Sequence, residues 1–125
     1  SYTVSEDGKS SITKYKVEKK FRHLSKVSFY PKTGRTHQIR VHATYLGYPI
    51  FGDMKYGGGF SKTRGFLPEF TNYYKKKMKN FNRHALHATR LEFTHPTTKL
   101  PVIFESTLPS DFLNLMNSIE SFYDE

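Results

Sequence analysis

The stretch Thr33-Gly-Arg-Thr-His-Gln-Ile-Arg-Val-His42 is followed closely by Gly47-Tyr-Pro-Ile-Phe-Gly-Asp-Met-Lys-Tyr-Gly57, and these two segments decide the fold of the central part of the chain. Together they contain two arginines, two histidines, a glutamine and four glycines. A solvated surface helix needs no such mixture. A site that binds a nucleic acid and pairs an arginine with a buried acid does need it. The two segments therefore form the candidate functional region.

The first segment predicts a helix over residues 37–46. Thr36 is a candidate N-cap, Gly47 suits the position just after the last turn, and Pro49 prevents the helix from continuing. Apolar residues recur at i, i+4 and i+7, which predicts an inner stripe made of Ile39, Ala43 and Leu46. The second segment is rich in glycine and predicts a loop over residues 52–59.

Strand patterns lie on both sides of this region. Partial alternation of apolar and polar residues over 11–21 and 24–30 predicts an antiparallel hairpin. A second hairpin is predicted from residues 86–94 and 100–105, and a closing helix from residues 109–122. The chain has 125 residues and no internal repeat, so it is expected to be one domain or part of one.

Two segments have weaker patterns. Residues 1–10 are polar and are expected to be flexible. Residues 60–82 predict either a short helix or a mobile insertion, and they contain the basic run Lys75-Lys-Lys-Met-Lys79 beside Tyr73, Tyr74 and Phe81. The first residue is not methionine, which fits a trimmed or excised fragment.

The formal net charge of +9 and the pI of about 9.7 favour a polyanionic partner, with RNA, DNA and anionic membranes all allowed. No apolar run reaches the roughly 18 residues of a membrane span, so no membrane span is expected. Among the polyanions, RNA and not a membrane is the expected partner. The absence of cysteine excludes disulfides, thiolate zinc sites and cysteine nucleophiles.

The six histidines do not predict a metal site. His37 and His42 are five residues apart, and His84 and His87 are three apart, whereas a helical zinc pair has the spacing His-x3-His. No glutamate stands between the members of either pair. Neither a metal nor any other cofactor is therefore expected.

The central run fits the pattern Gly-Arg-[Ser/Thr]-His-Gln-[Ile/Leu]-Arg-x-His, and it resembles the signature of RluA-type pseudouridine synthases, which isomerise uridine in RNA. The run Arg83-His-Ala-Leu-His-Ala88 resembles a further block of that family. The resemblance implies that Arg40 forms an ion pair with the catalytic aspartate. It also implies that Leu86 packs in the catalytic pocket as an aliphatic wall.

The resemblance implies an α+β fold with a mixed, largely antiparallel sheet and flanking helices. The chain resembles only the C-terminal half of that catalytic domain. The family's nucleophilic aspartate lies in a His-Arg-Leu-Asp motif and its tyrosine in a Lys-x-Tyr motif, and no counterpart of either motif occurs here. We therefore expect Arg40 to lack an aspartate partner within the chain and to lie near an open cleft. Asp53 is interpreted as a loop-forming residue that bonds its own backbone.

Several basic residues are candidates for binding RNA. Arg35 and His37 lie where the loop meets the predicted helix, and helix N-termini attract phosphate. The lysine run offers further backbone contacts, and the aromatic residues beside it could stack on bases. The predicted RNA-binding set is Arg35, His37, Lys75, Lys76, Lys77 and Lys79. Gln38 and His42 are expected to be buried or half-buried polar residues.

Three functions remain open from the sequence. The first is a fragment of a pseudouridine synthase acting on rRNA or tRNA and inactive alone, whose partner is RNA and either the missing N-terminal half or a second copy of the chain. The second is a non-catalytic RNA-binding module or degenerate synthase. The third is a ribonuclease using His37 or His42, for which no second acid or base stands at a recognisable spacing.

Overall fold

The computed structural model describes residues 2–5, 12–31, 36–94 and 96–124. Helices and strands of these residues form an α+β arrangement, which confirms the predicted fold class. The strands divide between two separate sheets, and every pairing among the described strands is antiparallel. The single mixed sheet that the resemblance implies is therefore divided into two among the described strands.

The first sheet has the order β1-β2-β3, with β1 at Tyr2–Ser5, β2 at Ile12–Lys20 and β3 at Ser25–Pro31. Strands β2 and β3 form the first predicted hairpin, with Tyr15 opposite Phe29 and their ring centroids 6.0 Å apart. Strand β1 was not predicted. Residues 1–10 were expected to be flexible, yet Tyr2–Ser5 pairs with β2, while residues 6–10 lie outside the described residues.

Helix α1 spans Thr36–Tyr45 and confirms the predicted helix to within one residue at each end. Ile39 and Ala43 are buried, as the apolar stripe predicts. Leu46 is 37% exposed, so its place in the inner stripe was wrong. The reason is that the helix ends at Tyr45 and the chain turns at Gly47, whose φ is +86°, which takes Leu46 off the helical face.

The glycine-rich segment after α1 contains two short 3-10 helices, η1 at Met54–Tyr56 and η2 at Phe60–Thr63. Residues 60–82, for which the sequence left a helix or a mobile insertion open, form η2 and then helix α2 at Pro68–Asn80. Pro68 stands at the start of α2, where proline removes no needed hydrogen-bond donor.

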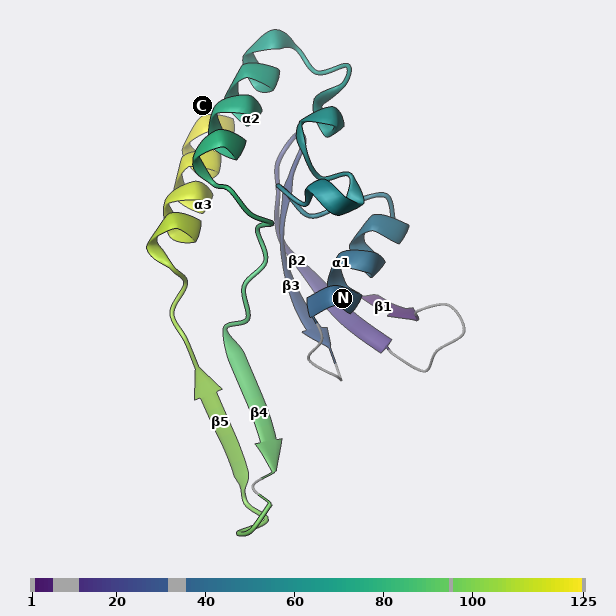
Figure 1. Ribbon diagram of the computed structural model, residues 1–125, viewed down its shortest axis with the longest axis vertical. Coiled ribbons are helices and arrows are strands. Elements are labelled where there is room, and N and C mark those ends of the chain that lie inside the picture. Colours follow the sequence, from purple (N-terminus) through teal and green to yellow (C-terminus); the bar gives the residue numbers. More distant parts are fainter. Residues whose placement is uncertain (1, 6–11, 32–35, 95, 125) are drawn as a thin grey trace.

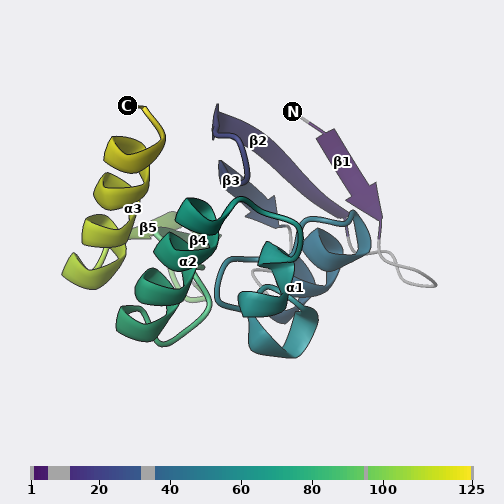
Figure 2. The same cartoon turned by 90° about the horizontal axis from the view of Figure 1, so that it is seen from above.

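Helix α3 at Ser110–Tyr123 confirms the predicted closing helix and lies beside α2 (Figures 1 and 2). Aromatic contacts join the two helices. The rings of Tyr73 and Phe122 stack with centroids 3.8 Å apart, and the Tyr73 hydroxyl lies 2.7 Å from Ser118 Oγ. The buried core at this end is mainly aromatic and consists of Phe51, Tyr74, Phe81, Leu115 and Ile119.

Strands β4 (Arg90–Thr94) and β5 (Pro101–Glu105) form the second predicted hairpin, which extends away from the rest of the molecule (Figure 1). The predicted strand began at residue 86, four residues too early. The backbone of residues 83–86 instead packs against the loop that follows α1, as described below. On the extended hairpin Leu100 and Ile103 are exposed, which leaves apolar surface uncovered there.

Candidate functional site

The central feature of the region is an ion pair between Arg40 of α1 and Asp53 in the following loop. Arg40 Nε donates to Asp53 Oδ2 at 2.8 Å, and Arg40 Nη2 donates to Asp53 Oδ1 at 2.9 Å. The contact is therefore bidentate, the strongest geometry available to an arginine and a carboxylate. The Asp53 side chain is 1% exposed and that of Arg40 is 20% exposed. The carboxylate is buried, and the guanidinium reaches the surface.

This pair corrects the expectation that Arg40 lacks an aspartate partner within the chain. Asp53 was interpreted as a loop-forming residue, and its backbone does have that role, because Asp53 O accepts from Gly58 N at 2.8 Å. Its side chain is directed mainly to Arg40, and the backbone N–H of Tyr56 in the same loop also hydrogen-bonds to the carboxyl and helps to lower its pKa. The two residues are 13 positions apart, so no helical or strand period predicts the contact.

Two glycines hold the loop in the conformation that buries Asp53. Gly52 has a φ of +79°, which L side chains rarely adopt, and a Cβ there would overlap the Arg83 carbonyl oxygen. A Cβ at Gly58 would overlap the Ile50 carbonyl oxygen. Hydrogen bonds from Gly52 N to Gly58 O at 2.8 Å and from Asp53 N to Ile50 O at 2.9 Å close the loop. The glycines therefore allow the close backbone approach that fixes Asp53.

The segment with Leu86 lies against this same loop. Ala85 N donates to Phe51 O at 2.8 Å, and Leu86 follows directly as a partly buried residue. The structure thus brings the backbone before Leu86 next to the residues before Asp53, although the two are far apart in sequence. The predicted place of the Leu86 side chain in a pocket wall stays a prediction.

Electrostatics keep the ion pair charged. The Arg40 guanidinium lowers the pKa of the Asp53 carboxyl, with burial opposing the shift and the electrostatic interaction with His84 supporting it. The Asp53 carboxylate in turn raises the pKa of Arg40. Each partner favours the charged form of the other, so the pair stays ionised throughout the neutral range.

Tyr56, at the end of η1, lies beside the Arg40 guanidinium. The Cζ atom of Arg40 is 5.1 Å from the centroid of the Tyr56 ring. This distance fits a cation–π contact. His37 lies beside Tyr56, with both ring nitrogens 3.4 Å from the Tyr56 hydroxyl. His37 was predicted to bind RNA, whereas Tyr56 was not predicted to belong to the site. The signal was available, because Tyr56 stands three residues after Asp53 in the same glycine-bounded motif.

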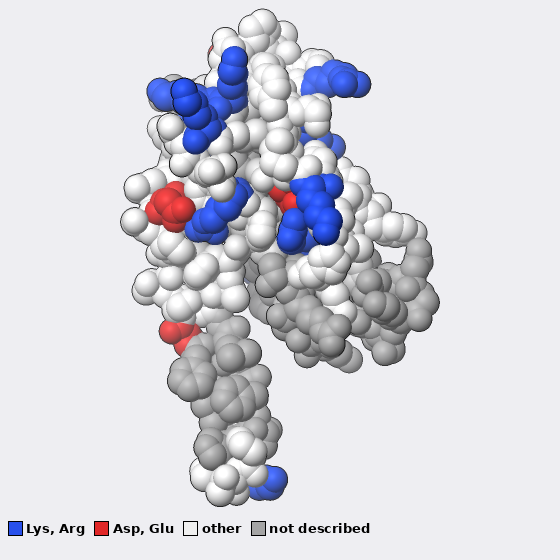
Figure 3. Space-filling model, in the orientation of Figure 1, with Lys and Arg blue, Asp and Glu red and all other residues white. Residues whose placement is uncertain are grey.

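The predicted RNA-binding residues that the structure describes belong to two different helices, α1 and α2. Arg35 lies outside the described residues, and His37 is exposed beside the ion pair. In α2, Lys75, Lys76 and Lys79 are exposed, and Lys77 is half-buried over the Tyr73 ring at 5.5 Å. On the face drawn in Figure 3, lysine and arginine side chains form several separate groups, and acidic side chains are sparse.

The aromatic residues beside the lysines do not take the predicted base-stacking role. Tyr74 is 2% exposed and Phe81 is 4% exposed, because both belong to the core. The Tyr73 ring is stacked on Phe122 instead. Gln38 and His42, predicted to be at least half-buried, are 6% and 3% exposed. Among the described residues, no helix is long and apolar enough to cross a membrane.

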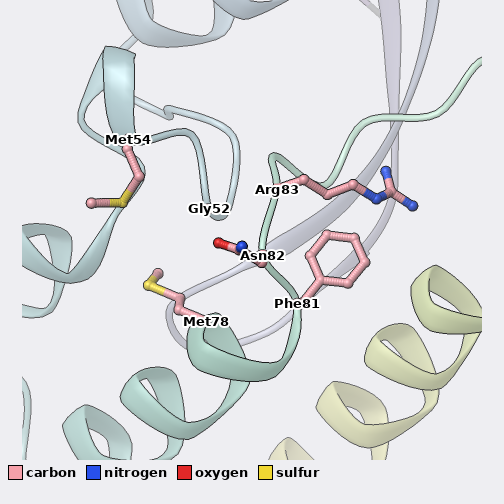
Figure 4. Close-up of a pocket in the computed structure, with 6 residues that line it drawn as sticks. All are labelled: Gly52, Met54, Met78, Phe81, Asn82 and Arg83. Carbon is pink, nitrogen blue, oxygen red and sulfur yellow. The ribbon is translucent and has the colours of Figure 1, made fainter.

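Other candidate sites are weak. A pocket of about 110 Å³ lies between the Gly52 loop and the end of α2, and it is lined by Gly52, Met54, Met78, Phe81, Asn82 and Arg83. In Figure 4 the Arg83 side chain points away from Gly52, and its guanidinium pairs with Asp111. Within the described ranges, no three histidine, aspartate or glutamate side chains are close enough to hold a metal ion.

The chain is similar to proteins named ribosomal large subunit pseudouridine synthase D. It is 41% identical to that of Blochmanniella floridana over 117 residues, which cover 92% of this chain and 35% of that protein. For Buchnera aphidicola subsp. Schizaphis graminum the identity is 43% over 109 residues, 87% of this chain and 34% of that protein. For the protein of Vibrio cholerae the identity is 39% over 113 residues, which cover 90% of this chain and 34% of that protein. The chain thus spans about a third of the length of these curated relatives, and it matches no family model.

Proposed function

The chain belongs to the RluA-type family of RNA pseudouridine synthases, and on that premise we propose that it forms part of an enzyme that isomerises uridine to pseudouridine in RNA of the ribosomal large subunit. The name shared by the relatives favours ribosomal RNA over tRNA as the substrate. The observation that carries the proposal is the fixed guanidinium of Arg40, which is held by a buried carboxylate while the Arg40 side chain itself is 20% exposed.

Arg40 serves the reaction by pairing with the nucleophilic carboxylate. A positive charge beside a carboxylate lowers the pKa of that carboxylate and restricts its rotamer. At neutral pH the carboxylate is therefore ionised and held in one orientation. The nucleophile itself comes from a His-Arg-Leu-Asp motif that is not in this chain. A further segment of the enzyme, or another chain, therefore supplies it.

Asp53 is a poor nucleophile for two physical reasons. Its side chain is 1% exposed, so an RNA base cannot reach it. Both of its carboxylate oxygens are also directed to Arg40 inside the buried loop, so neither oxygen is available at the surface where an RNA base would bind. These contacts support the assignment of the nucleophile to another segment.

RNA is the partner that this charge distribution favours. The net charge of +9 attracts phosphate, and the exposed lysines of α2 (Lys75, Lys76 and Lys79) supply contacts to the backbone rather than to particular bases. Because binding of this kind releases counterions, the affinity of the chain for RNA should fall steeply as salt increases. An affinity that does not change with salt would contradict a mainly electrostatic mode.

A chimera tests the function directly. This chain replaces the matching segment of the Blochmanniella floridana synthase, and the product is assayed for pseudouridine formation in large-subunit RNA made without modification. We expect the chimera to be active and the chain alone to form no pseudouridine. Arg40→Met in the chimera should abolish activity, whereas Arg64→Met, at an exposed arginine after η2, should not.

Each alternative has its own outcome. A folded chimera without activity would favour a non-catalytic RNA-binding module. Activity of the chain alone that is lost on Asp53→Asn would contradict the assignment of the nucleophile to another segment. Activity of the chain alone as an RNA-cleaving enzyme, lost on His37→Ala, would favour a ribonuclease.

A further inference from the structure

We propose that Asp53 is a positioning residue. It binds one edge of the Arg40 guanidinium, formed by Nε and Nη2, and so leaves the other edge, formed by Nη1 and Nη2, directed to a second carboxylate. The inference rests on the proposed function, in which Arg40 pairs with a carboxylate from outside this chain. It goes beyond that function by giving Asp53 a role and by specifying which donors of Arg40 remain available.

The geometry of the ion pair divides the guanidinium into a used edge and an available edge. A guanidinium carries five N–H donors in one plane, one on Nε and two on each Nη. Asp53 binds the side edge formed by Nε and Nη2. The end edge, formed by Nη1 and the second proton of Nη2, has the same forked geometry and can bind another carboxylate.

The end edge of Arg40 faces solvent. Within the described residues, every hydrogen bond of the guanidinium goes to Asp53, and Nη1 is not among the buried polar atoms that lack a partner. The side chain as a whole is 20% exposed. A donor without a protein partner that is not buried is accessible to water, and therefore to an incoming oxyanion.

Three contacts fix the direction of this edge. The carboxylate of Asp53 sits in a loop whose backbone is bonded on both sides, from Asp53 N to Ile50 O at 2.9 Å and from Gly58 N to Asp53 O at 2.8 Å. The Tyr56 ring lies 5.1 Å from the guanidinium carbon and limits its rotation. An arginine on a solvated helix has none of these restraints, so it loses more side-chain entropy when it binds.

A merely structural ion pair and a positioning pair predict different results for Asp53→Asn. The amide keeps the shape of the side chain but removes the charge and offers an N–H group to the Arg40 donors. If Asp53 only stabilises the fold, activity follows the folded fraction of the protein. If it positions Arg40, the folded protein loses kcat, because misplacing a catalytic group by about 1 Å can cost about 100-fold.

The first experiment measures kcat and KM of the chimera described above, carrying Asp53→Asn, at a temperature where circular dichroism shows it fully folded. We expect kcat to fall about 100-fold with KM changed much less. The matched control is Asp111→Asn, which removes the other Arg–Asp contact, where Arg83 Nη2 lies 3.2 Å from Asp111 Oδ1 on the exposed start of α3. This control should leave kcat unchanged. An Asp53→Asn protein with unchanged kcat would overturn the inference.

The second experiment does not depend on activity. In this chain labelled with ¹⁵N-arginine, the Arg40 Nε–H resonance should be protected from exchange with water, and Asp53→Asn should abolish that protection while Asp111→Asn leaves it intact. If the chimera is inactive with Asp53 present, the proposed function fails. The exchange measurement then decides alone whether Asp53 holds Arg40, and equal exchange in the chain with and without Asp53→Asn would overturn that too.

Discussion

Two regions of the molecule bury their side chains for different reasons. One is the loop after α1, and the other is the pair of helices α2 and α3. The loop buries a charged group, Asp53, which needs Arg40 beside it and glycines in the backbone around it. The helix pair buries aromatic rings, among them Tyr74 and Phe81, whose burial rests mainly on close packing, although the Tyr74 hydroxyl also donates to His23 O at 3.4 Å. A buried ion pair contributes little net stability but fixes the orientation of its two side chains, whereas buried rings contribute stability. The loop is thus built for geometry, and the helix pair supports it.

The largest expected effect on stability is in the helix pair. Phe81→Ala removes a ring that is 4% exposed, and such truncations cost about 3–5 kcal/mol of unfolding free energy. Urea denaturation followed by circular dichroism measures the loss. The control is Leu113→Ala, on the exposed side of α3, where the loss should be much smaller because the side chain is 45% exposed. Equal losses would mean that the aromatic cluster is not the core.

The next effect breaks the ion pair from the arginine side. Arg40→Met leaves the Asp53 carboxylate buried and unpaired, which costs on the order of 3 kcal/mol at neutral pH. Asp53→Asn should cost less, because the partly exposed Arg40 can turn its guanidinium to water. Both are compared by denaturation at pH 7. If the aspartate substitution proved the more damaging, the carboxylate would not be the buried partner that limits stability.

A smaller effect depends on pH. Arg40 holds the pKa of Asp53 below its usual value, so the ion pair contributes stability above the unfolded pKa of about 4. That contribution is lost as the pH falls through the still lower folded pKa. Thermal unfolding is measured between pH 7 and pH 2 for the unsubstituted chain and for Asp53→Asn. The difference in melting temperature between the two should be constant near neutral pH and should shrink only in the acid range. An advantage independent of pH would contradict a charged Asp53.

The smallest effect is expected at an exposed ion pair. Lys19 of β2 contacts Glu120 at 3.0 Å and Asp124 at 2.8 Å near the end of α3, and all three side chains are well exposed. Water and salt screen such contacts. Lys19→Met should change the melting temperature by less than about 2 °C. A larger drop in low salt, absent in high salt, would show that this contact links the first sheet to α3.

Local patterns in the sequence predicted much of the fold. Sequence periodicity predicted helices α1 and α3, the hairpin of β2 and β3, and the hairpin of β4 and β5. In each of these elements apolar residues recur with the period that places them on one face. The burial of Ile39 and Ala43 followed from the same period. Leu46 was misplaced because a turn at Gly47 ends the helix one residue earlier than the apolar spacing suggests.

What the sequence determined by itself was Arg40 as a site residue and the helix that carries it. Asp53 and Tyr56 also lie in a motif that can be read along the chain, but their contacts with Arg40 were not predicted from it. Only the tertiary structure decided how they meet. The ion pair depends on a loop whose backbone closes upon itself, and the burial of Tyr74 and Phe81 depends on α3 packing against α2. Periodicity describes one element at a time, whereas these contacts join elements whose relative placement is set by packing and loop closure.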